Sequence, residues 1–520
     1  MRALVLLILT LVPLAARADP ATVGRGLNVR LVADMFASTF AFMEPRILKA
    51  EPIPTLAVWA LGGLTVLDSR LAPDLQPSGL RLTFAHRLLV ERKAPAAGDA
   101  MAWGETVAVL VHAGWDASAP VRQAGTQGVL RVLLGELCSH FDPYTRYVPP
   151  AEADADRVHR EGSARIGARV AVRKGGFVLQ DVAADGPAAA AGAHDGDRLL
   201  AVDGQSLAGA TMDQVAALLA GPEGTLVELT LGRAGAAPRS VGVERRLVPP
   251  RSVSAARRGD ILLLRVSGFA ANTGAQLADA LADALDSGRR LRGVVIDLRG
   301  NRGGLLREAV AAAETLLAHG VVAVTAGRDP AAAHDFVAHG VDSAVGLPVV
   351  VVVDGASASS AEILAAALAD QHRAVVVGSS TLGKGVVQTI APLPDGGELF
   401  VSWSRVLAPL GWPLQGLGVL PQVCTSLGAA PLRRQLAQLA RGVQPMADAL
   451  SRHRAARPPL SPNQVLELRT ACPAGDGSTL DLVAARRLIG NPRAYEAALI
   501  GPPPSMQAAA LHAARLGTAP

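Results

Sequence analysis

The spacing of apolar residues changes along the chain and divides it into segments of different character. Up to residue 150, apolar positions recur mainly at helical spacing, so we expect a helical N-terminal region over residues 19–150. Residues 151–161 are polar and charged, and they predict a hinge. The predicted helices span residues 27–42, 54–67 and 121–140.

Short apolar runs then alternate with glycine turns over residues 163–246, and one helix interrupts them. This helix begins at Thr211, whose side chain can cap it together with Gln214. A module of this size is small for an enzyme and is typical of a peptide-binding fold. The predicted strands are residues 169–172, 177–182, 198–202 and 226–231.

Residues 250–428 alternate between apolar strands and helices, and the strands lack polar alternation. Strands of this kind are covered on both faces, as in a β/α core. Residues 429–520 contain helical segments and Pro-rich loops without a chemical motif, so we expect a helical tail. The predicted strands are residues 261–266, 294–298, 349–353 and 374–377, and the predicted helices are residues 273–285, 305–319 and 359–372.

The first 18 residues indicate the compartment. Arg2 precedes an apolar run that ends before Ala16-Arg17-Ala18, a small-x-small cleavage pattern. A membrane anchor is the alternative, but the run is shorter than the ~20 residues of a spanning helix. We therefore expect a signal peptide over residues 1–18, a mature protein that begins at Asp19, and export, most simply to a periplasm.

Composition and charge exclude several classes of protein. Half of the residues are hydrophobic and 18% are charged, which excludes disorder over most of the chain. The 50 Lys and Arg against 45 Asp and Glu leave a net charge of +5, too small an excess for a nucleic-acid binder. The chain has three cysteines, Cys138, Cys424 and Cys472, which are too few for a disulfide scaffold. No two of them have the C-x-x-C spacing of a metal site. Cys424 and Cys472 can pair in an oxidising compartment, although any of the three pairings stays open.

Three segments carry candidate chemistry. In the first, Ser359 lies between the strand over residues 349–353 and an Ala-rich helix, where free backbone amides can hold an oxyanion. Ser359 and Glu362 also have the spacing of a capping box, and Ser357 or Ser359 can simply be a helix cap. The two roles do not exclude each other.

The second segment contains Lys384 between two glycines and two apolar strands. Burial lowers the pKa of a lysine from about 10.4 towards neutrality and makes it a general base. A surface lysine or an anion site is the alternative. Residues 378–384 match the start of a phosphate-binding loop, but Gly385 replaces its Ser or Thr and a strand follows, so we reject a nucleotide site.

The third segment, residues 297–304, runs from a strand end through a glycine loop into a helix, which can bring amides close to a carbonyl oxygen. A plain tight turn is the alternative. His372 lies at the far end of the helix that starts at Ser359, roughly 20 Å away, so it cannot complete a Ser-His-Asp triad. Ser359 with Lys384 is the better pair.

Together these segments resemble the carboxy-terminal processing (tail-specific) serine proteases over most of residues 27–425. Residues 297–304 match the D-L-R-x-N-x-G-G segment of that family, and residues 409–421 match its closing segment. Residues 142–147 resemble its entry motif, and residues 183–202 resemble the core of its PDZ domain. The resemblance implies an α+β multidomain chain with a PDZ domain over 163–246, a crotonase/ClpP-like β/α protease core over 250–428 and helical regions at both ends.

The resemblance also implies the residues of the site. The nucleophile falls on Ser359, the general base on Lys384, and the glutamine that orients the lysine on Gln388. The implied oxyanion hole is the Ser360 amide with that of Gly304 or Gly303, and no metal or cofactor is implied. The implied carboxylate loop of the PDZ domain is Arg165, Ile166, Gly167 and Ala168, with Met212, Val215 and Leu219 on the helix beside it.

The chain departs from the family's pattern outside the three catalytic side chains. Ala361 replaces a serine, Leu382 a phenylalanine and Gln422 an aspartate, while Arg165 replaces a glycine and leaves the tail preference open. We expect an exported serine endopeptidase that binds unfolded or apolar C-terminal tails of protein substrates. The alternative is a non-catalytic PDZ scaffold or a protease that waits for an adaptor protein. The resemblance also implies a homo-oligomer formed through the terminal helices.

Overall fold

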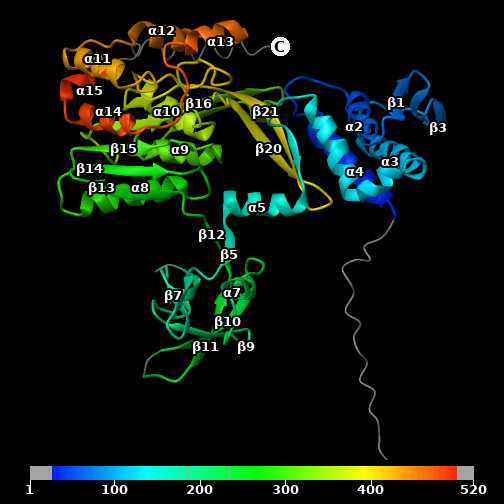
Figure 1. Cartoon of the computed structure of the whole chain (residues 1–520), viewed down its shortest axis with the longest axis horizontal. Helices are drawn as coiled ribbons and strands as arrows, with labels where there is room; N and C mark the ends of the chain where they lie inside the picture. The colour runs from blue at the N-terminus through cyan, green and yellow to red at the C-terminus, as the bar shows by residue number, and fades with distance from the viewer. Residues whose placement is uncertain (1–25, 184–185, 234, 500–520) are drawn as a thin grey trace, which may run out of the picture. The chain divides into compact units, whose positions relative to one another are not determined.

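The computed structural model describes residues 26–183, 186–233 and 235–499, so the expected signal peptide lies outside the described residues (Figure 1). The chain forms two compact units. The described part of unit 1 is residues 26–45, 50–149 and 390–400, and unit 2 contains the rest.

Unit 1 combines helices with a small antiparallel sheet of order β1-β2-β3. The helices pack in pairs, α1 on α3 and α2 on α4, around fully buried Phe36, Phe40 and Trp103. The helices are α1 (Val29–Met43), α2 (Ile53–Leu67), α3 (Ala100–Ala117) and α4 (Ala119–Ser139). The strands are β1 (Leu71–Gln76), β2 (Gly79–Phe84), β3 (Arg87–Arg92) and β4 (Arg146–Val148), and β4 pairs with residues Glu398–Phe400.

Three of these helices lie within two residues of the predicted ranges, but two segments differ from the prediction. Residues 71–92 form strands, and their alternation is weak because only Leu71, Leu80 and Leu82 are fully buried side chains. The predicted hinge is the helix α5 (Pro150–Glu161). Its charges suit a helix, since Glu152 lies in the first turn and Arg160 in the last, where each complements the helix dipole.

Residues 163–248 form a small β module around one apolar core. The sheet has the order β11-β10-β8-β7-β6, β9 pairs with β8, and β12 pairs with β5. Thr211 and Gln214 form the predicted capping box of α7. The strands are β5 (Ser163–Arg165), β6 (Arg169–Arg173), β7 (Gly176–Gln180), β8 (Arg198–Val202), β9 (Gln205–Ser206), β10 (Leu226–Gly232), β11 (Arg239–Glu244) and β12 (Arg246–Val248), and the helices are α6 (Pro187–Ala190) and α7 (Met212–Leu219).

The centre of unit 2 is a sheet of order β13-β14-β15-β18-β19-β22, in which only the β13–β14 pair is antiparallel. The predicted strands and helices of this region are all present, with bounds shifted by a few residues. The strands are β13 (Val253–Arg258), β14 (Ile261–Val266), β15 (Gly293–Asp297), β18 (Val349–Val353), β19 (Ala374–Gly378) and β22 (Val423–Cys424), and the helices are α8 (Thr273–Asp286), α9 (Leu306–Glu314) and α10 (Ser360–Asp370).

A second sheet of order β17-β16-β21-β20 follows the first. Its central pair is antiparallel and joins residues 324–327 to residues 404–407. The strand β20 begins two residues after Lys384, so this sheet holds one end of the Lys384 loop. The elements are β16 (Gly320–Gly327), the 3-10 turn η2 (Pro330–Ala332), β17 (His334–Ala338), β20 (Val386–Pro392) and β21 (Glu398–Leu407).

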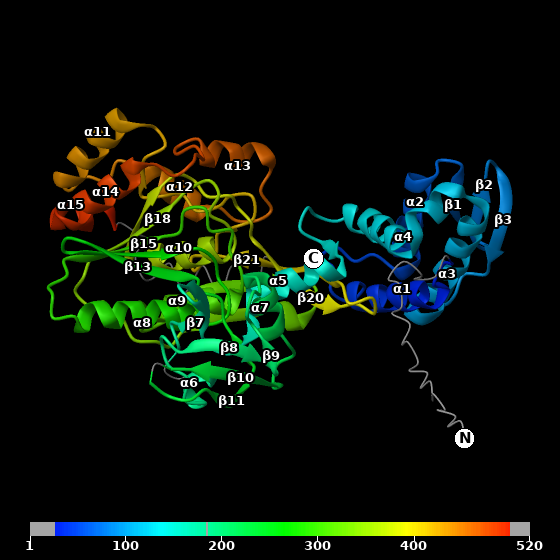
Figure 2. The same cartoon turned by 60° about the horizontal axis from the view of Figure 1, so that its bottom comes forward.

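The tail covers one face of the parallel sheet. Alternate residues of β18 belong to two different cores: Val351 packs with α10, and Val350 packs with the tail helices α11, α14 and α15 (Figures 1 and 2). This cover explains why the strands are apolar on both faces. The tail helices are α11 (Ala429–Ala440), α12 (Ala447–Ala455), α13 (Pro462–Arg469), α14 (Thr479–Ile489) and α15 (Pro492–Ala498).

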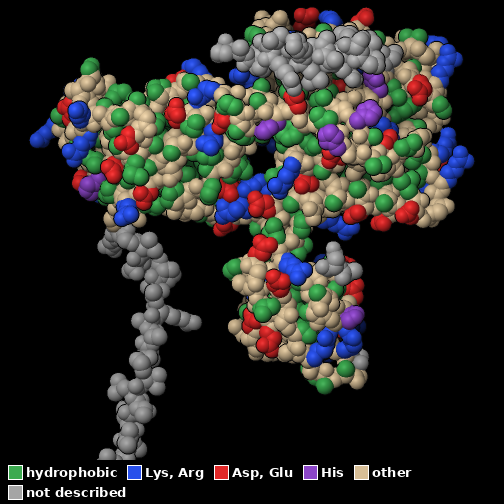
Figure 3. Space-filling view, turned by 180° about the vertical axis from the view of Figure 1, so that it is seen from behind, with side chains coloured by type: hydrophobic (Ala, Val, Ile, Leu, Met, Phe, Trp, Pro, Cys, Tyr) green, Lys and Arg blue, Asp and Glu red, His purple; other side chains and the backbone are tan. Residues whose placement is uncertain are grey.

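A disulfide joins the core to this tail. Cys424 bonds to Cys472, and Cys138 is a buried free thiol. Of the three pairings that the sequence left open, the structure therefore contains the one between Cys424 and Cys472. Among the described residues, no helix combines the length and apolarity needed to span a bilayer. On the face seen in Figure 3, basic and acidic side chains are interspersed.

Candidate active site

The three candidate segments follow neighbouring parallel strands and therefore meet at one edge of the sheet. Asp297 ends β15, Asp354 follows β18, and Gly378 ends β19. The carboxyl ends of parallel strands form the usual site edge of an open α/β sheet. Candidate residues far apart in the sequence are thus brought together at this edge.

Ser359 lies in the turn between β18 and α10 and is the N-cap of that helix. Its backbone has φ 57° and ψ −119°, a strained conformation for a residue with a side chain. The residue is partly exposed, whereas every residue of α10 is buried. A rigid buried helix therefore presents Ser359 at its positive end, where developing negative charge is stabilised.

Glu362 connects Ser359 to Lys384. The Glu362 carboxylate is fully buried, and its Oε2 accepts hydrogen bonds from the backbone N–H of Ser359 at 2.7 Å and of Lys384 at 2.9 Å. Its Oε1 accepts from the Thr381 hydroxyl at 2.5 Å and from the Gly383 N–H at 2.7 Å. Burial raises the pKa of Glu362, and these four hydrogen bonds oppose the rise. One carboxylate oxygen therefore holds the backbones of both candidate reacting residues.

Lys384 is partly buried in the loop between β19 and β20. Its Nζ donates to Gln388 Oε1 at 3.0 Å, so Gln388 fixes one direction of the ammonium or amine group. The neighbouring glycines are needed for close packing: a Cβ on Gly383 would lie 2.9 Å from the Gly416 backbone, and one on Gly385 would lie 2.0 Å from the Gln415 nitrogen.

The oxyanion candidates surround Ser359. A Cβ on Gly303 would lie 2.7 Å from the Ser359 Cβ, so this loop packs directly against the serine. The Gly303 N–H donates to Asn301 Oδ1 at 2.8 Å. By contrast, the Ser360 and Gly304 N–H groups have no acceptor among the residues that the structure describes. Of the two glycines predicted for the oxyanion hole, Gly304 is therefore the one whose backbone N–H is available to bind an oxyanion.

Asp354 shapes the turn that leads to Ser359. Its carboxylate accepts from the Gly300 N–H at 3.0 Å and from the Ser357 N–H at 2.9 Å. The Ser357 hydroxyl also lies 2.9 Å from the Leu298 carbonyl, to which it donates, and the residue is fully buried. Ser357 is therefore a structural residue of the turn, and Ser359 is the accessible serine.

The predicted tail-binding residues occupy different environments in the β module. The side chains of Ile166 and Val215 are buried in its core, Leu219 is partly buried, and Met212 is 37% exposed. Gly167 has φ +74°, and a Cβ there would lie 2.6 Å from the Pro187 ring. Arg165 ends β5 and is exposed, and Ala168 packs partly against the core. A ligand can thus meet Met212 but not the Val215 side chain.

The sequence interpretation missed part of the site. It treated Glu362 only as a capping residue, because the three other donors to its carboxylate lie about twenty positions further along. His372 follows the far end of α10, as predicted. Within the described ranges, no cluster of three or more His, Cys, Asp or Glu side chains is arranged to hold a metal ion.

Comparison with known proteins gives two matching families. Residues 260–425 match peptidase family S41, and residues 178–233 match the PDZ domain. A carboxy-terminal-processing protease of Bartonella bacilliformis is 32% identical over 301 residues, which cover 57% of this chain and 69% of that protein. The carboxy-terminal processing protease CtpA of Bacillus subtilis is 30% identical over 297 residues, which cover 57% of this chain and 63% of that protein. A solved photosystem II D1 C-terminal processing protease has 27% identity and a TM-score of 0.34, covering 71% of this chain and 92% of that one.

Proposed function

Because the chain belongs to peptidase family S41 and to its carboxy-terminal processing proteases with a PDZ domain, we propose that it is an exported endopeptidase with a Ser359–Lys384 dyad. The chain is a serine-type peptidase by its family. The assignment of the dyad depends chiefly on one observation: the backbones of Ser359 and Lys384 bind the same oxygen of Glu362.

In the proposed reaction, neutral Lys384 accepts the hydroxyl proton of Ser359 as the Oγ attacks the scissile carbonyl carbon. The Ser360 and Gly304 amides hold the oxyanion of the tetrahedral intermediate. The proton then passes to the leaving amine, and the C–N bond breaks. A water molecule attacks the acyl-enzyme with Lys384 as base, and the proton returns to the Ser359 Oγ as the new carboxyl product leaves. Gln388 keeps the Lys384 Nζ directed during both steps.

The proposed substrates are proteins whose unfolded, apolar C-terminal tails bind the PDZ domain. Backbone amides of residues 165–168 would bind the terminal carboxylate, and an extended tail can add a strand beside α7. Exposed Met212 on α7 is the side chain best placed for an apolar contact with the tail.

Export to the periplasm is the proposed location. The Cys424–Cys472 disulfide supports it, since disulfides persist in oxidising compartments. N-terminal sequencing of the protein from a periplasmic extract should begin at Asp19. A protein that keeps residues 1–18 in the cytosol would contradict export.

The test of the dyad uses an unfolded protein that ends in apolar residues and the same protein with an acidic end. We expect the parent to cleave the apolar-tailed substrate faster, and Ser359→Ala and Lys384→Met to be inactive. Lys93→Met, which changes an exposed lysine, is the matched control and should cleave like the parent. Cleavage by Lys384→Met at the parent rate would overturn the dyad. If the parent itself is inactive, activity after a tail-binding adaptor is added would indicate an adaptor-dependent protease, and continued inactivity a scaffold.

A further inference from the structure

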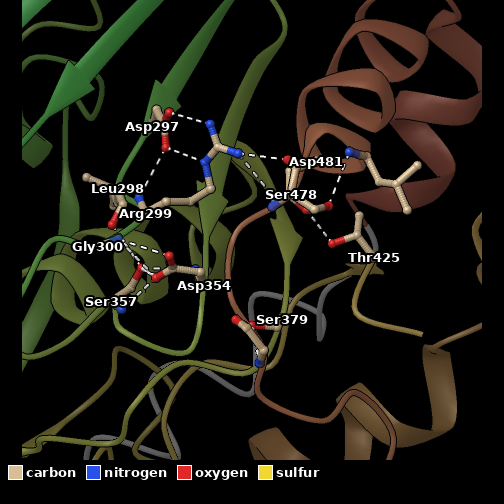
Figure 4. Close-up of polar contacts among 12 residues, drawn as sticks. Asp297, Leu298, Arg299, Gly300, Asp354, Ser357, Ser379, Thr425, Ser478 and Asp481 are labelled. Carbon is tan, nitrogen blue, oxygen red and sulfur yellow. Dashed lines mark hydrogen bonds and ion pairs between the residues drawn. The ribbon is translucent and has the colours of Figure 1, made fainter. Parts of the chain in front are cut away.

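The C-terminal tail contacts the glycine loop of the active site through one buried ion-pair network. Arg299 Nη1 lies 3.1 Å from Asp481 Oδ2 and donates to the Ser478 carbonyl at 2.8 Å (Figure 4). The same guanidinium donates to both oxygens of Asp297, at 2.8 and 2.7 Å. Asp481 in turn accepts from the Thr425 hydroxyl at 2.5 Å, so a single side chain of α14 links the tail to Arg299, two residues after β15, and to Thr425, directly after β22.

This network is shielded from solvent. The side chains of Asp297 and Asp481 are 4% and 2% exposed, and that of Arg299 is 17% exposed. Burial raises the pKa of Asp297, but its hydrogen bond to Arg299 and the charge of that guanidinium outweigh burial and leave the pKa lowered. Removing one charged group from this network would therefore leave its partner buried without a counter-charge. The Arg299 side chain depends on Asp481 for part of its placement.

Arg299 is connected to the residues proposed to hold the oxyanion through the loop that follows it. Gly300, the next residue, donates to Asp354, whose turn leads to Ser359. Asn301 then organises the loop: its carbonyl accepts from the Ala358 N–H at 2.9 Å, and its side chain holds Gly303. A displacement of Arg299 would therefore be transmitted to Gly304 and to the turn before Ser359.

The tail also contacts the segment that precedes Lys384. Arg469 donates to the Thr381 carbonyl at 2.7 Å, and the Ser380 hydroxyl donates to the Cys472 carbonyl at 2.6 Å. Ser379 exchanges hydrogen bonds with Gly475, at 3.0 and 3.1 Å. These tail residues lie outside the 260–425 match to the peptidase family. The disulfide at Cys472 fastens the same stretch of tail to the core.

We propose that Asp481 is a positioning residue for the peptidase reaction, because it holds Arg299 and thereby the loop that supplies the oxyanion amide. The tail stretch over residues 469–481 is then part of the active-site support, fastened by the Cys424–Cys472 disulfide. This inference rests on the proposed function. It assigns to the tail a role in catalysis in addition to covering the sheet.

The test compares Asp481→Asn with Asp342→Asn. Asp342 is the control, since it also pairs with a largely buried arginine, Arg373, at 2.7 and 3.0 Å, but Arg373 lies just before β19 begins and so at the opposite edge of the sheet. We expect Asp481→Asn to lower kcat about 10- to 100-fold with KM within about twofold of the parent, as for a misplaced catalytic loop. Asp342→Asn should keep the parent kcat. A parent-like kcat in Asp481→Asn, or an equal loss in Asp342→Asn, would overturn the proposal.

Amide hydrogen exchange of residues 300–304 provides a readout that does not need proteolysis. We expect faster exchange there in Asp481→Asn but not in Asp342→Asn, and unchanged exchange would overturn the proposal even if the parent cleaves nothing. An inactive parent would instead count against the proposed function alone. If Asp481→Asn does not fold, the double variant Cys424→Ser/Cys472→Ser loosens the same stretch and is judged by the same two readouts.

Discussion

At the scale of single residues, Glu362 shows how a residue with no proposed part in the reaction can hold the reacting residues in place. It accepts one hydrogen bond from the turn of Ser359 and three from residues 381–384, so two loops share one acceptor. A carboxylate is suited to this role because it accepts with both oxygens and donates with neither when ionised.

Glu362→Gln should lower kcat/KM at least about 10-fold. The amide NH₂ cannot accept, so at least one of the four donors loses its partner, at a cost of ~1–3 kcal/mol. Steady-state cleavage and thermal unfolding measure the two effects. Glu308→Gln is the control, because the Glu308 side chain is only 13% exposed and also accepts from a backbone N–H, that of Gly274 at 3.2 Å. Equal activity of both variants would show that the shared acceptor is not needed.

The sequence predicted only the local half of this arrangement. The spacing of Ser359 and Glu362 predicts a capping box, which is present, because that contact joins residues only three positions apart. The contacts of Glu362 with Thr381 and Lys384 depend on the neighbouring placement of β18 and β19, which no spacing encodes. The pairing of Cys424 with Cys472 was left open for the same reason.

At the scale of elements, the loop over residues 298–305 determines how close the oxyanion donor comes to Ser359. The loop joins β15 to α9, and its glycines allow it to pack against the turn that begins α10. Gly303 has φ +94° and no room for a side chain, since a Cβ would lie 2.7 Å from that of Ser359 and 2.8 Å from the Ala358 carbonyl oxygen.

Gly303→Ala should therefore abolish cleavage while the chain still folds. Gly288→Ala is the matched control: Gly288 has a similar positive φ of +67°, but nothing lies within 4 Å of its Cβ position. Both variants carry the backbone strain of about 1 kcal/mol, and only the first moves Ser359. Cleavage assays with circular dichroism separate the two effects. Retained activity in Gly303→Ala would show that the loop can move away without harm.

Elements with one strong pattern were predicted well, and those with mixed patterns were not. The strand β18 reads as five consecutive valines, so it is found at the predicted residues. The strand β1 contains Pro73 and only one fully buried residue, and the polar helix α5 has no apolar stripe to reveal it. These short or exposed elements obtain their stability from neighbours that the local sequence does not contain.

At the scale of the whole molecule, the tail is an integral part of unit 2. Its helices were predicted, but their packing on the parallel sheet was not, since an amphipathic helix does not indicate which surface it covers. His453 on α12 is an example: it is buried against Trp412, and its Nε2 lies 3.0 Å from the Gly418 carbonyl in the closing segment. Burial lowers the pKa of His453 to about 3, and the nearby charge of Arg454 adds to this effect.

This histidine should make the folded state sensitive to acid. An unfolded histidine has a pKa of about 6.5, so between about pH 6.5 and the folded value of about 3 the unfolded chain binds the extra proton. The stability that it contributes is complete above pH 6.5 and decreases by ~1.4 kcal/mol for each pH unit below it. His453→Gln should remove this slope. Chemical unfolding of the parent and the variant at pH 7 and pH 5 measures it, and identical pH dependence would contradict the assignment.

The central claim, that Ser359 is activated by Lys384, is tested most directly by labelling with a fluorophosphonate, which reacts with activated serines. Mass spectrometry of the digested protein identifies the labelled residue, and the time course gives the rate. The account predicts a single adduct on Ser359 in the parent, formed at least about 100-fold more slowly in Lys384→Met, because a positioned general base contributes ~10²–10⁴ in rate. An adduct on another serine, or an equal labelling rate in Lys384→Met, would contradict it.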